Sequence, residues 1–422
     1  MTEVKEQKPK KPMAKSMQML KAQTAEIYRH AWEVKKAGGH VGWSTAIFPM
    51  ELCETFDVPL LYPENNAASV SARHNGQFLI QHAEGEMRYP INICSYARLN
   101  IAMADLASKD ELDWPKEEPY MPVPTFVCLC NNSCTQLMKW YENLSRNLGI
   151  PIFFVDALYN YYEEEPSSYK VKYVRQQIEE NITKMEEFFG KKFDYDRFLE
   201  VQNIGQENVK LFNEIVALNQ RVPAPINGFD LFSYLSCMVI ARGKRSTTEI
   251  LRQLKSEVLE NIENGHSTFG DGIEKYRMHW EGIACWPYLG HNLKTLKREG
   301  VNCVINGYVT AWAIEYEPGD LDGMAKGYQL ASTNSFSTPS IMAKRTKTIN
   351  DFHCDGMLCH VNRSCKLMTF HIFVGREIIE ENCGVPVVNF DGDQSDERCY
   401  SSAQFETRLQ GAVEVMQANK EA

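Results

Sequence analysis

The sequence predicts an α/β protein with two parallel-sheet domains and a helical block that connects them. Short apolar runs alternate with helix-like segments up to about residue 165 and again after residue 270, which is typical of βαβ units. Between them, residues 168–220 are rich in Glu and Lys and strongly helical in pattern. The 422 residues suffice for two or three domains that each bury a core.

This pattern divides the chain into four expected parts. They are a flexible N-terminal tail at 1–24, an N-terminal α/β domain at 25–165, a helical connection at 166–270 and a C-terminal α/β domain at 271–422. Both α/β domains are expected to be Rossmann-like or flavodoxin-like. The tail contains a basic cluster, Lys8 to Lys15. No apolar segment follows that cluster, so it is not a secretory signal.

In the N-terminal half, helical periodicity covers residues 16–37 and ends at a glycine pair. Short apolar runs bounded by polar turns then predict strands, with helices between them. The strands are expected at 40–44, 58–62, 124–130 and 151–156, and the helices at 68–84, 95–107 and 134–147.

The helical block and the C-terminal half follow the same reasoning. Amphipathic patterns predict helices after residue 168, at 231–241 and at 246–264. Further apolar runs predict strands at 283–287, 303–308, 356–361 and 385–390, with helices near 319–331, 366–382 and 402–418.

Composition excludes several classes of function. A net charge of −10 without a basic stripe argues against nucleic-acid binding. No run approaches the roughly 18 apolar residues that a membrane span needs, so we expect a cytoplasmic protein. Glycine-rich phosphate loops of the ATP-binding and dinucleotide-binding types are also missing from the sequence.

Cysteine is abundant for a chain expected in a reducing compartment, with 13 residues. Four lie inside apolar segments and are expected to be buried core residues: Cys53, Cys237, Cys285 and Cys303. Seven others lie near predicted strand ends: Cys94, Cys128, Cys130, Cys134, Cys354, Cys359 and Cys365.

Two apolar runs end in nearly the same four residues, Asn131-Asn-Ser-Cys134 and Asn362-Arg-Ser-Cys365. Each cysteine should emerge beyond the carboxyl end of a parallel strand, where α/β sheets bind ligands. Cys94 opens a third polar turn. Three thiols on loops indicate an iron–sulfur or other metal site. A zinc half-site at Cys128-x-Cys130-x₃-Cys134 and buried free thiols remain open alternatives.

Other candidate side chains have structural alternatives. Glu64 follows a predicted strand and could act as a general base or stabilise the start of the next helix. Ser44 and Thr45 could bind a substrate or serve as turn hydroxyls. The polar groups His279, Glu281 and His291 are expected to be satisfied within the core.

The sequence resembles the 2-hydroxyacyl-CoA dehydratase family, which includes benzoyl-CoA reductase subunits, from about residue 25 to residue 418. It is most similar to α subunits that act on lactoyl-, 2-hydroxyisocaproyl- or phenyllactyl-CoA. The matching segments include Gly42-Trp-Ser-Thr-Ala-Ile-Phe-Pro-Met-Glu51, Tyr62-Pro-Glu-Asn-Asn-Ala-Ala68, Ile93-Cys-Ser-Tyr-Ala-Arg98, Cys130-Asn-Asn-Ser-Cys134, Asn227-Gly-Phe-Asp-Leu-Phe232, Trp280-Glu-Gly-Ile283, Asn362-Arg-Ser-Cys-Lys366 and Asp391-Gly-Asp393.

The resemblance implies a [4Fe–4S] cluster held by Cys94, Cys134 and Cys365, with one iron open for the substrate. It also implies a flavin in the holo-complex, a homologous β subunit, a separate ATP-dependent iron–sulfur activator and an acyl-CoA substrate. Water would leave a 2-hydroxyacyl-CoA through a ketyl radical to give the 2-enoyl-CoA.

In that reaction Glu64 would be the base and Ser44 or Thr45 would steady the departing hydroxyl, because Ala46 stands where related chains often have serine. A benzoyl-CoA-reductase-type subunit and a non-catalytic electron-relay subunit are the alternatives. The relay subunit predicts a fourth cysteine ligand such as Cys130.

Overall fold

The computed structural model describes residues 13–115, 120–160, 165–331 and 335–421. Two four-stranded sheets, both entirely parallel, confirm the predicted α/β class. The first sheet has the order β2-β1-β3-β4, with β1 (Gly42–Ser44), β2 (Leu60–Leu61), β3 (Phe126–Cys130) and β4 (Ile152–Val155). The second has the order β6-β5-β7-β8, with β5 (Tyr276–Glu281), β6 (Val301–Asn306), β7 (Gly356–Asn362) and β8 (Val387–Gly392).

The two sheets share one topology. In each, the first strand along the chain pairs with both the second and the third, so the strand order reverses beside it. The first sheet therefore has its switch point between β1 and β3, and the second has it between β5 and β7. Ligands of open α/β sheets bind outside the carboxyl ends of the strands at such points.

The helices of the N-terminal half are α1 (Lys15–Lys36), α2 (Glu51–Thr55), α3 (Pro63–Ala72), α4 (Gln77–Gly85), α5 (Ser95–Ser108) and α6 (Gln136–Leu148). The single helix predicted at 68–84 is two helices, separated by a turn in which His74 has φ +60°. Helix α1 begins within the segment predicted as a tail. Residues 1–12 of that tail lie outside the described part of the chain, and the predicted domain limits remain predictions.

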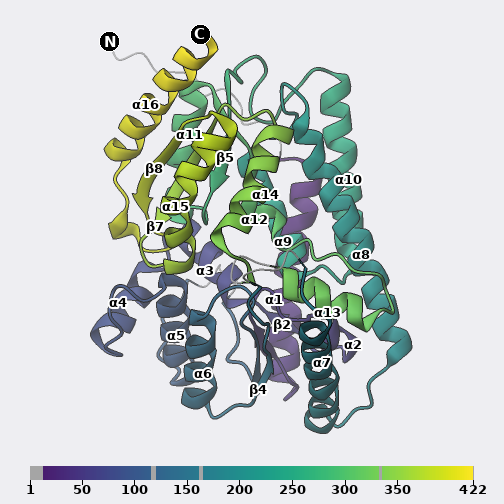
Figure 1. Ribbon diagram of the computed structural model, residues 1–422. Coiled ribbons are helices and arrows are strands. Elements are labelled where there is room, and N and C mark those ends of the chain that lie inside the picture. The colour runs from purple at the N-terminus through teal and green to yellow at the C-terminus, as the bar shows by residue number, and fades with distance from the viewer. Residues whose placement is uncertain (1–12, 116–119, 161–164, 332–334, 422) are drawn as a thin grey trace.

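The predicted helical block contains α7 (Ser168–Phe189), α8 (Tyr195–Ala217), α9 (Gly228–Ile240) and α10 (Arg245–Glu263). Helix α10 packs against both α8 and α1, and α8 and α10 run along the right of the molecule in Figure 1. Side chains fix where two of these helices start: Asp194 accepts a hydrogen bond from Arg197 N, and Asn227 accepts one from Phe229 N.

The C-terminal half contains α11 (Leu289–Glu299), α12 (Gly307–Thr310), α13 (Leu321–Leu330), α14 (Thr338–Asp351), α15 (Lys366–Cys383) and α16 (Ser402–Glu421). Helices α2, α11, α12 and α14 were not among the sequence predictions. The last two strands occupy the upper left of Figure 1 beside α15 and α16, and the first sheet lies below them.

The strand predicted at 283–287 is wrong, because the strand of this region is β5, which ends at Glu281. Gly282 ends it with φ +99°, and a Cβ there would lie 2.6 Å from His360 O. Residues 283–285 form a buried loop followed by a short 3₁₀ helix, Trp286–Tyr288. The apolar run is thus explained by burial at the carboxyl end of β5.

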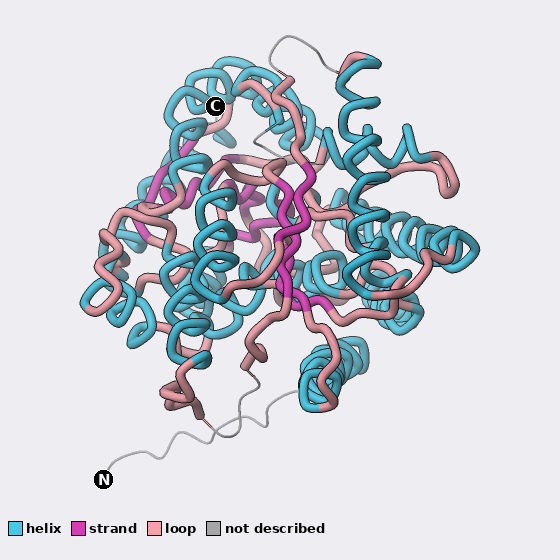
Figure 2. The backbone as a smooth tube through the Cα atoms, turned by 90° about the horizontal axis from the view of Figure 1, so that it is seen from below, coloured by secondary structure: helices cyan, strands magenta, loops and turns pink. Residues whose placement is uncertain are grey.

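The first sheet separates two cores. Along β3, Phe126, Cys128 and Cys130 face one core, while Val127 and Leu129 face the other, as the two-residue period of a strand requires. Figure 2 shows the strands enclosed by helices on both sides. None of the helices in the described segments has the length and apolar character needed to cross a membrane.

Candidate functional site

Three cysteines predicted as ligands line a single cavity, together with Glu64. Cys134 comes from the loop after β3, Cys365 from the loop after β7 and Cys94 from the start of α5. The cavity contains about 850 Å³ of empty space, counting its open mouth. Because two of the loops follow the switch-point strands of different sheets, the cavity lies where both sheets are expected to bind ligands.

Backbone geometry leaves the three sulfur atoms available to the cavity. Cys94 and Cys365 are the N-cap residues of α5 and α15, and neither side chain caps its helix. The Sγ of Cys134 accepts a hydrogen bond from Gln136 N at 3.3 Å. All 13 cysteines are free thiols, so no disulfide competes for these sulfur atoms.

A fully buried carboxylate, Asp393, connects two of the cysteine loops. Ser95 Oγ donates to Asp393 Oδ1 at 2.5 Å, and Ser364 N donates to Oδ2 at 2.9 Å. Ser95 N also donates to Ser364 Oγ at 3.0 Å. Since these serines are the neighbours of Cys94 and Cys365, Asp393 fixes the spacing of the two cysteines.

Gln394 lies beside the sulfur atom of Cys94. Its Nε2 donates to Cys94 Sγ at 3.6 Å and to Ser364 Oγ at 3.0 Å. The Gln394 side chain is fully buried. Hydrogen bonds to ligand sulfur are among the features that set the potential of an iron–sulfur cluster.

Burial raises the pKa of all three thiols. The pKa of Cys94 rises to about 12, and that of Cys365 rises well above its usual range because of burial and then the nearby Cys134 and Cys94. The pKa of Cys134 is raised by burial. The thiols therefore stay protonated on their own, and a bound metal would have to displace their protons.

Thiolate sulfur is the usual ligand of iron–sulfur clusters, and three thiols line the cavity. Within the described residues, no group of three or more His, Cys, Asp or Glu side chains converges closely enough for one metal ion. A single zinc ion needs all its ligands within about 2.3 Å, whereas each thiolate of an iron–sulfur cluster binds a different iron. Besides the three thiols and Glu64, the lining contains the hydroxyls of Tyr96, Ser133 and Tyr308 and the Gln136 amide.

Glu64 sits in the first turn of α3, just after β2. Its Oε1 accepts a hydrogen bond from Ala46 N at 3.0 Å, and Tyr141 OH donates to Oε2 at 3.2 Å. Burial raises the pKa of Glu64 to about 7, although both hydrogen bonds oppose the rise. The group is therefore suited to exchanging a proton near neutral pH.

The structure does not bring Ser44 into the cavity. Ser44 is fully buried and donates to Thr45 O at 3.0 Å, while Thr45 Oγ1 accepts from Cys130 N at 3.0 Å. Neither residue lines the cavity, whereas Ala46 does. Ser133 lines it too, and its buried hydroxyl has no hydrogen-bond partner in the described structure.

Arg345 forms one wall of the cavity. Its Nε and Nη2 donate to the two oxygens of Glu281 at 2.6 and 3.2 Å, and His279 and His371 each place Nε2 2.9 Å from a Glu281 oxygen. Although burial alone would raise it, Arg345 and the histidines hold the pKa of Glu281 well below its usual range. The predicted burial and hydrogen bonding of Glu281 are confirmed, whereas His279 is satisfied only at Nε2 and its buried Nδ1 has no partner in the described structure.

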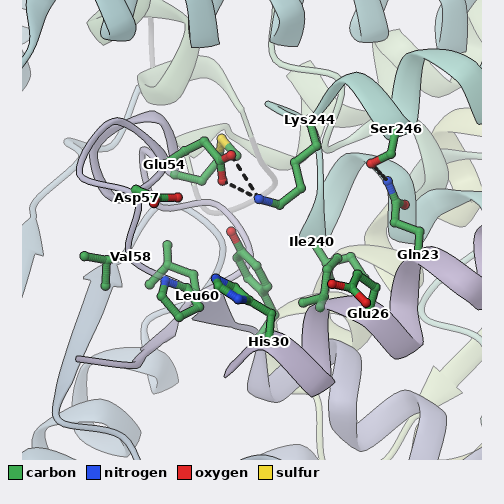
Figure 3. Close-up of a pocket in the computed structure, with 14 residues that line it drawn as sticks. Gln23, Glu26, His30, Glu54, Asp57, Val58, Leu60, Ile240, Lys244 and Ser246 are labelled. Atoms are coloured by element: carbon green, nitrogen blue, oxygen red, sulfur yellow. Dashed lines mark hydrogen bonds and ion pairs between the residues drawn. The ribbon is translucent and has the colours of Figure 1, made fainter. Parts of the chain in front are cut away.

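A different cavity lies between α1, the β2 region and α10 (Figure 3). The Lys244–Glu54 ion pair at 2.8 Å closes one side of it, and Gln23 Nε2 donates to Ser246 Oγ at 2.7 Å. Neither Glu64 nor any of the three cysteines predicted as ligands lines this cavity. It is therefore separate from the candidate site.

The sequence is similar to those of known proteins over nearly its whole length. Residues 45–416 match the family model described as 2-hydroxyglutaryl-CoA dehydratase, D-component. The chain belongs to this family. It is 43% identical to an (R)-2-hydroxyisocaproyl-CoA dehydratase α subunit from Clostridioides difficile, covering 94% of this chain and 95% of that protein.

Two further relatives extend over the same length. An (R)-phenyllactyl-CoA dehydratase α subunit from Clostridium sporogenes is 39% identical, covering 100% of this chain and 98% of that protein. A lactoyl-CoA dehydratase subunit α from Anaerotignum propionicum is 34% identical, covering 97% of this chain and 98% of that protein. The family resemblance drawn from sequence motifs is thereby confirmed.

Among the residues of this site that sequence reasoning missed are Ser133, Arg345 and Asp393. Ser133 belongs to the repeated Asn-x-Ser-Cys motif, and Asp393 lies in a segment already noted as a family match, so both carried a signal. Arg345 follows no strand and lies within α14, and only the tertiary fold brings it to the cavity.

Proposed function

We propose that this chain is the α subunit of an iron–sulfur (R)-2-hydroxyacyl-CoA dehydratase, a hydro-lyase that forms a 2-enoyl-CoA. The observation that carries the proposal is the cavity that joins Cys94, Cys134 and Cys365 to a carboxyl group with a pKa near 7. The α-subunit names of the relatives imply a partner subunit. A β subunit and an ATP-dependent activator complete the proposed system.

The three cysteines would hold the [4Fe–4S] cluster. Such a cluster would transfer electrons. Because only three thiolates bind it, one of its four irons would have no cysteine ligand. Cys130 is fully buried within β3 and does not line the cavity, which favours a catalytic subunit over an electron-relay subunit with four cysteine ligands. A benzoyl-CoA-reductase role gains no support from the three dehydratase subunits compared above.

Glu64 is proposed as the base. The β-hydrogen of a 2-hydroxyacyl thioester is not acidic until one electron has been added and the 2-hydroxyl expelled, after which a carboxylate can remove it. The hydrogen bonds from Ala46 N and Tyr141 OH orient the carboxylate. A pKa near 7 makes it a stronger base than an ordinary glutamate.

Ser133 is proposed to steady the departing hydroxyl, the role that the sequence suggested for Ser44. Its unpartnered hydroxyl lines the cavity, while the Ser44 hydroxyl is held by a backbone carbonyl. Ser133→Ala should keep the iron content and lower turnover, whereas Ser44→Ala should leave turnover near normal. The reverse pattern would return the role to Ser44.

The decisive experiment is an anaerobic assay of the complex with its activator and ATP. Lactoyl-, 2-hydroxyisocaproyl- and phenyllactyl-CoA are compared as substrates, and formation of the enoyl-CoA is followed by its absorbance. We expect turnover of at least one thioester by iron-loaded protein. Iron-loaded complex that turns over none of them would contradict the proposal.

A further inference from the structure

Tyr308 brings a phenol group to the wall of the cavity that the three cysteines line. It follows β6, at the carboxyl end of the second sheet, and is the second residue of α12. The side chain of Asn306 accepts hydrogen bonds from Tyr308 N at 2.7 Å and from Val309 N at 2.9 Å. These bonds fix where the short helix begins, so the end of the strand holds the backbone that carries the phenol.

Packing holds the Tyr308 ring as well. Its centre lies 4.4 Å from that of the Trp312 ring, which also lines the cavity. Burial raises the pKa of Tyr308, and the nearby Glu64 and Cys365 raise it further. The phenol therefore keeps its proton at neutral pH, close to the proposed base and to one of the proposed cluster ligands.

A second tyrosine determines where that proton points. Tyr96, a buried residue of α5, hydrogen-bonds to the Tyr308 hydroxyl and so opposes the rise in the pKa of Tyr308. Trp286 Nε1 in turn donates to Tyr96 OH. An indole N–H can only donate, so the Tyr96 oxygen accepts from it and the Tyr96 proton is left for the Tyr308 oxygen. The Tyr308 proton is then directed away from Tyr96.

This chain of donors ends without an acceptor. In the described part of the protein, the Tyr308 hydroxyl hydrogen-bonds only to Tyr96, where it is the acceptor. Its own proton is therefore available to a ligand in the cavity. A few oriented polar groups in a mostly apolar lining are what fixes the orientation of a ligand in such a site. The matching ligand atom is an oxygen that accepts hydrogen bonds, and a thioester carbonyl supplies one.

The carbonyl oxygen is also the atom that gains most from this donor during the reaction. When one electron is added to a thioester, negative charge gathers on its carbonyl oxygen. A donor that is already oriented stabilises this charge more than it stabilises the neutral thioester, and therefore lowers the barrier. The Glu64 carboxylate cannot serve this step, because its own negative charge would repel the one that develops.

We propose that Tyr308 is a catalytic residue that donates a hydrogen bond to the thioester carbonyl oxygen, and that Tyr96 and Trp286 are positioning residues that direct its proton. The inference rests on the proposed function, which places an acyl-CoA in this cavity. It adds a residue to the reaction. It also assigns the carbonyl and the 2-hydroxyl of the substrate to different donors, since Ser133 is proposed for the hydroxyl.

The first test is steady-state kinetics of the complex with activator and ATP, at matched iron content, on the thioester that it turns over fastest. Tyr308→Phe removes only the hydroxyl and should lower kcat about 10²–10³-fold, the usual loss for one oxyanion donor, with little change in KM. Tyr288→Phe is the matched control and should keep the kcat of the wild type, because its hydroxyl donates to Glu397 O at 3.1 Å and does not line the cavity.

A second pair of variants tests the positioning chain. Trp286→Phe removes the indole donor and should lower kcat by about tenfold or less, the value of one hydrogen bond. In the Tyr308→Phe background the same substitution should cost nothing further, because Trp286 acts through Tyr308. Losses that add in the double variant would overturn the positioning role.

A spectroscopic test needs no turnover. 4-Methylpentanoyl-CoA lacks the 2-hydroxyl, so its acyl group offers Tyr308 only the carbonyl oxygen. With an isotopic label at that carbon, the infrared band of the bound carbonyl can be followed in the complex without activator. A hydrogen bond weakens the C=O bond, so the band should lie at a higher frequency in Tyr308→Phe than in the wild type. Tyr288→Phe should match the wild type.

Three results for Tyr308→Phe would overturn its proposed role: a normal kcat, a rise in KM without a loss of kcat, or an unshifted carbonyl band. If the wild-type complex turns over a thioester while this variant behaves normally, only the role of Tyr308 is wrong. If the wild-type complex neither binds the labelled thioester nor turns over any substrate, the proposed function itself fails.

Discussion

Replacing Glu64 with glutamine should stabilise the protein while it abolishes turnover. The glutamine side chain keeps the shape and can still accept from Ala46 N and donate to Tyr141 OH, the two partners of the carboxylate. What disappears is the cost of holding a charge away from water. Function and stability are therefore expected to change in opposite directions at this position.

The magnitude follows from the raised pKa. Folding moves the pKa of Glu64 from 4.5 to about 7, so the folded chain binds more protons than the unfolded chain between these values. The free energy of unfolding must then fall as the pH rises through that window. The carboxylate costs about 3 kcal/mol at pH 8 and about 1 kcal/mol at pH 5.

The assay is thermal unfolding of the wild type and Glu64→Gln at pH 5 and pH 8, with matched iron content. An unfolding entropy of about 2.1 cal/mol/K per residue means that each kcal/mol shifts the midpoint of this 422-residue chain by about 1 °C. The variant should gain about 2–3 °C more at pH 8 than at pH 5. Glu142→Gln, an exposed position on α6, serves as the control and should show no such difference.

A gain that does not depend on pH would refute the reasoning, because the effect would then not come from ionisation. A loss of stability at pH 8 would refute it too, since the carboxylate would then be contributing favourable interactions. Near-normal turnover of Glu64→Gln would separately remove this residue from the role of base. General bases typically contribute about 10²–10⁴-fold to a rate, so the expected loss is large.

Three further predictions concern the same cavity. The rate of the wild type should rise with pH through about 7 as Glu64 ionises, and a profile that is flat across neutral pH counts against the assignment. Cys365→Ser should lower the iron content measured by metal analysis. The control Cys383→Ser, at the other end of α15, should keep the iron content of the wild type. Equal iron contents in the two variants would exclude Cys365 as a ligand. Asp393→Asn should reduce the iron content and broaden the EPR signal, because it loosens two cysteine loops. The control Asp391→Asn, at a partly exposed position, should match the wild type. An unaltered spectrum in both variants would show that Asp393 does not position the cysteines.

Hydrophobic periodicity was enough to predict most of the fold. Seven of the eight strands coincide with predicted apolar runs, because parallel strands buried on both faces are continuously apolar. β5 is the exception, since it carries Arg277, His279 and Glu281. Arg277 and Glu281 are buried because distant groups satisfy them. Arg277 donates to Phe352 O, Arg221 O and Asn219 O, and Glu281 pairs with Arg345 and His371. Such partners cannot be read from the local sequence.

The residues of the candidate site that could be predicted are those that directly follow a strand. Cys134, Cys365 and Glu64 follow β3, β7 and β2, so the rule for parallel sheets locates them. Ser44 is the last residue of β1 and does not line the cavity, because its hydroxyl donates to the backbone carbonyl of Thr45. The direction of a short side chain depends on local hydrogen bonds that sequence spacing does not determine.

The Asn-x-Ser-Cys motif occurs at equivalent places in the two sheets, but its serine makes different contacts in each. Ser133 and Ser364 each precede a cysteine proposed as a ligand, after the third strand of their sheet. Ser364 Oγ accepts from Ser95 N and from Gln394 Nε2, so it is used in joining the cysteine loops. Ser133 Oγ has no such partner and lines the cavity. Because an unsatisfied buried hydroxyl costs stability, its retention is best explained by a ligand that completes its hydrogen bonding. The asymmetry between these equivalent serines therefore supports the proposed role of Ser133 in steadying the departing hydroxyl.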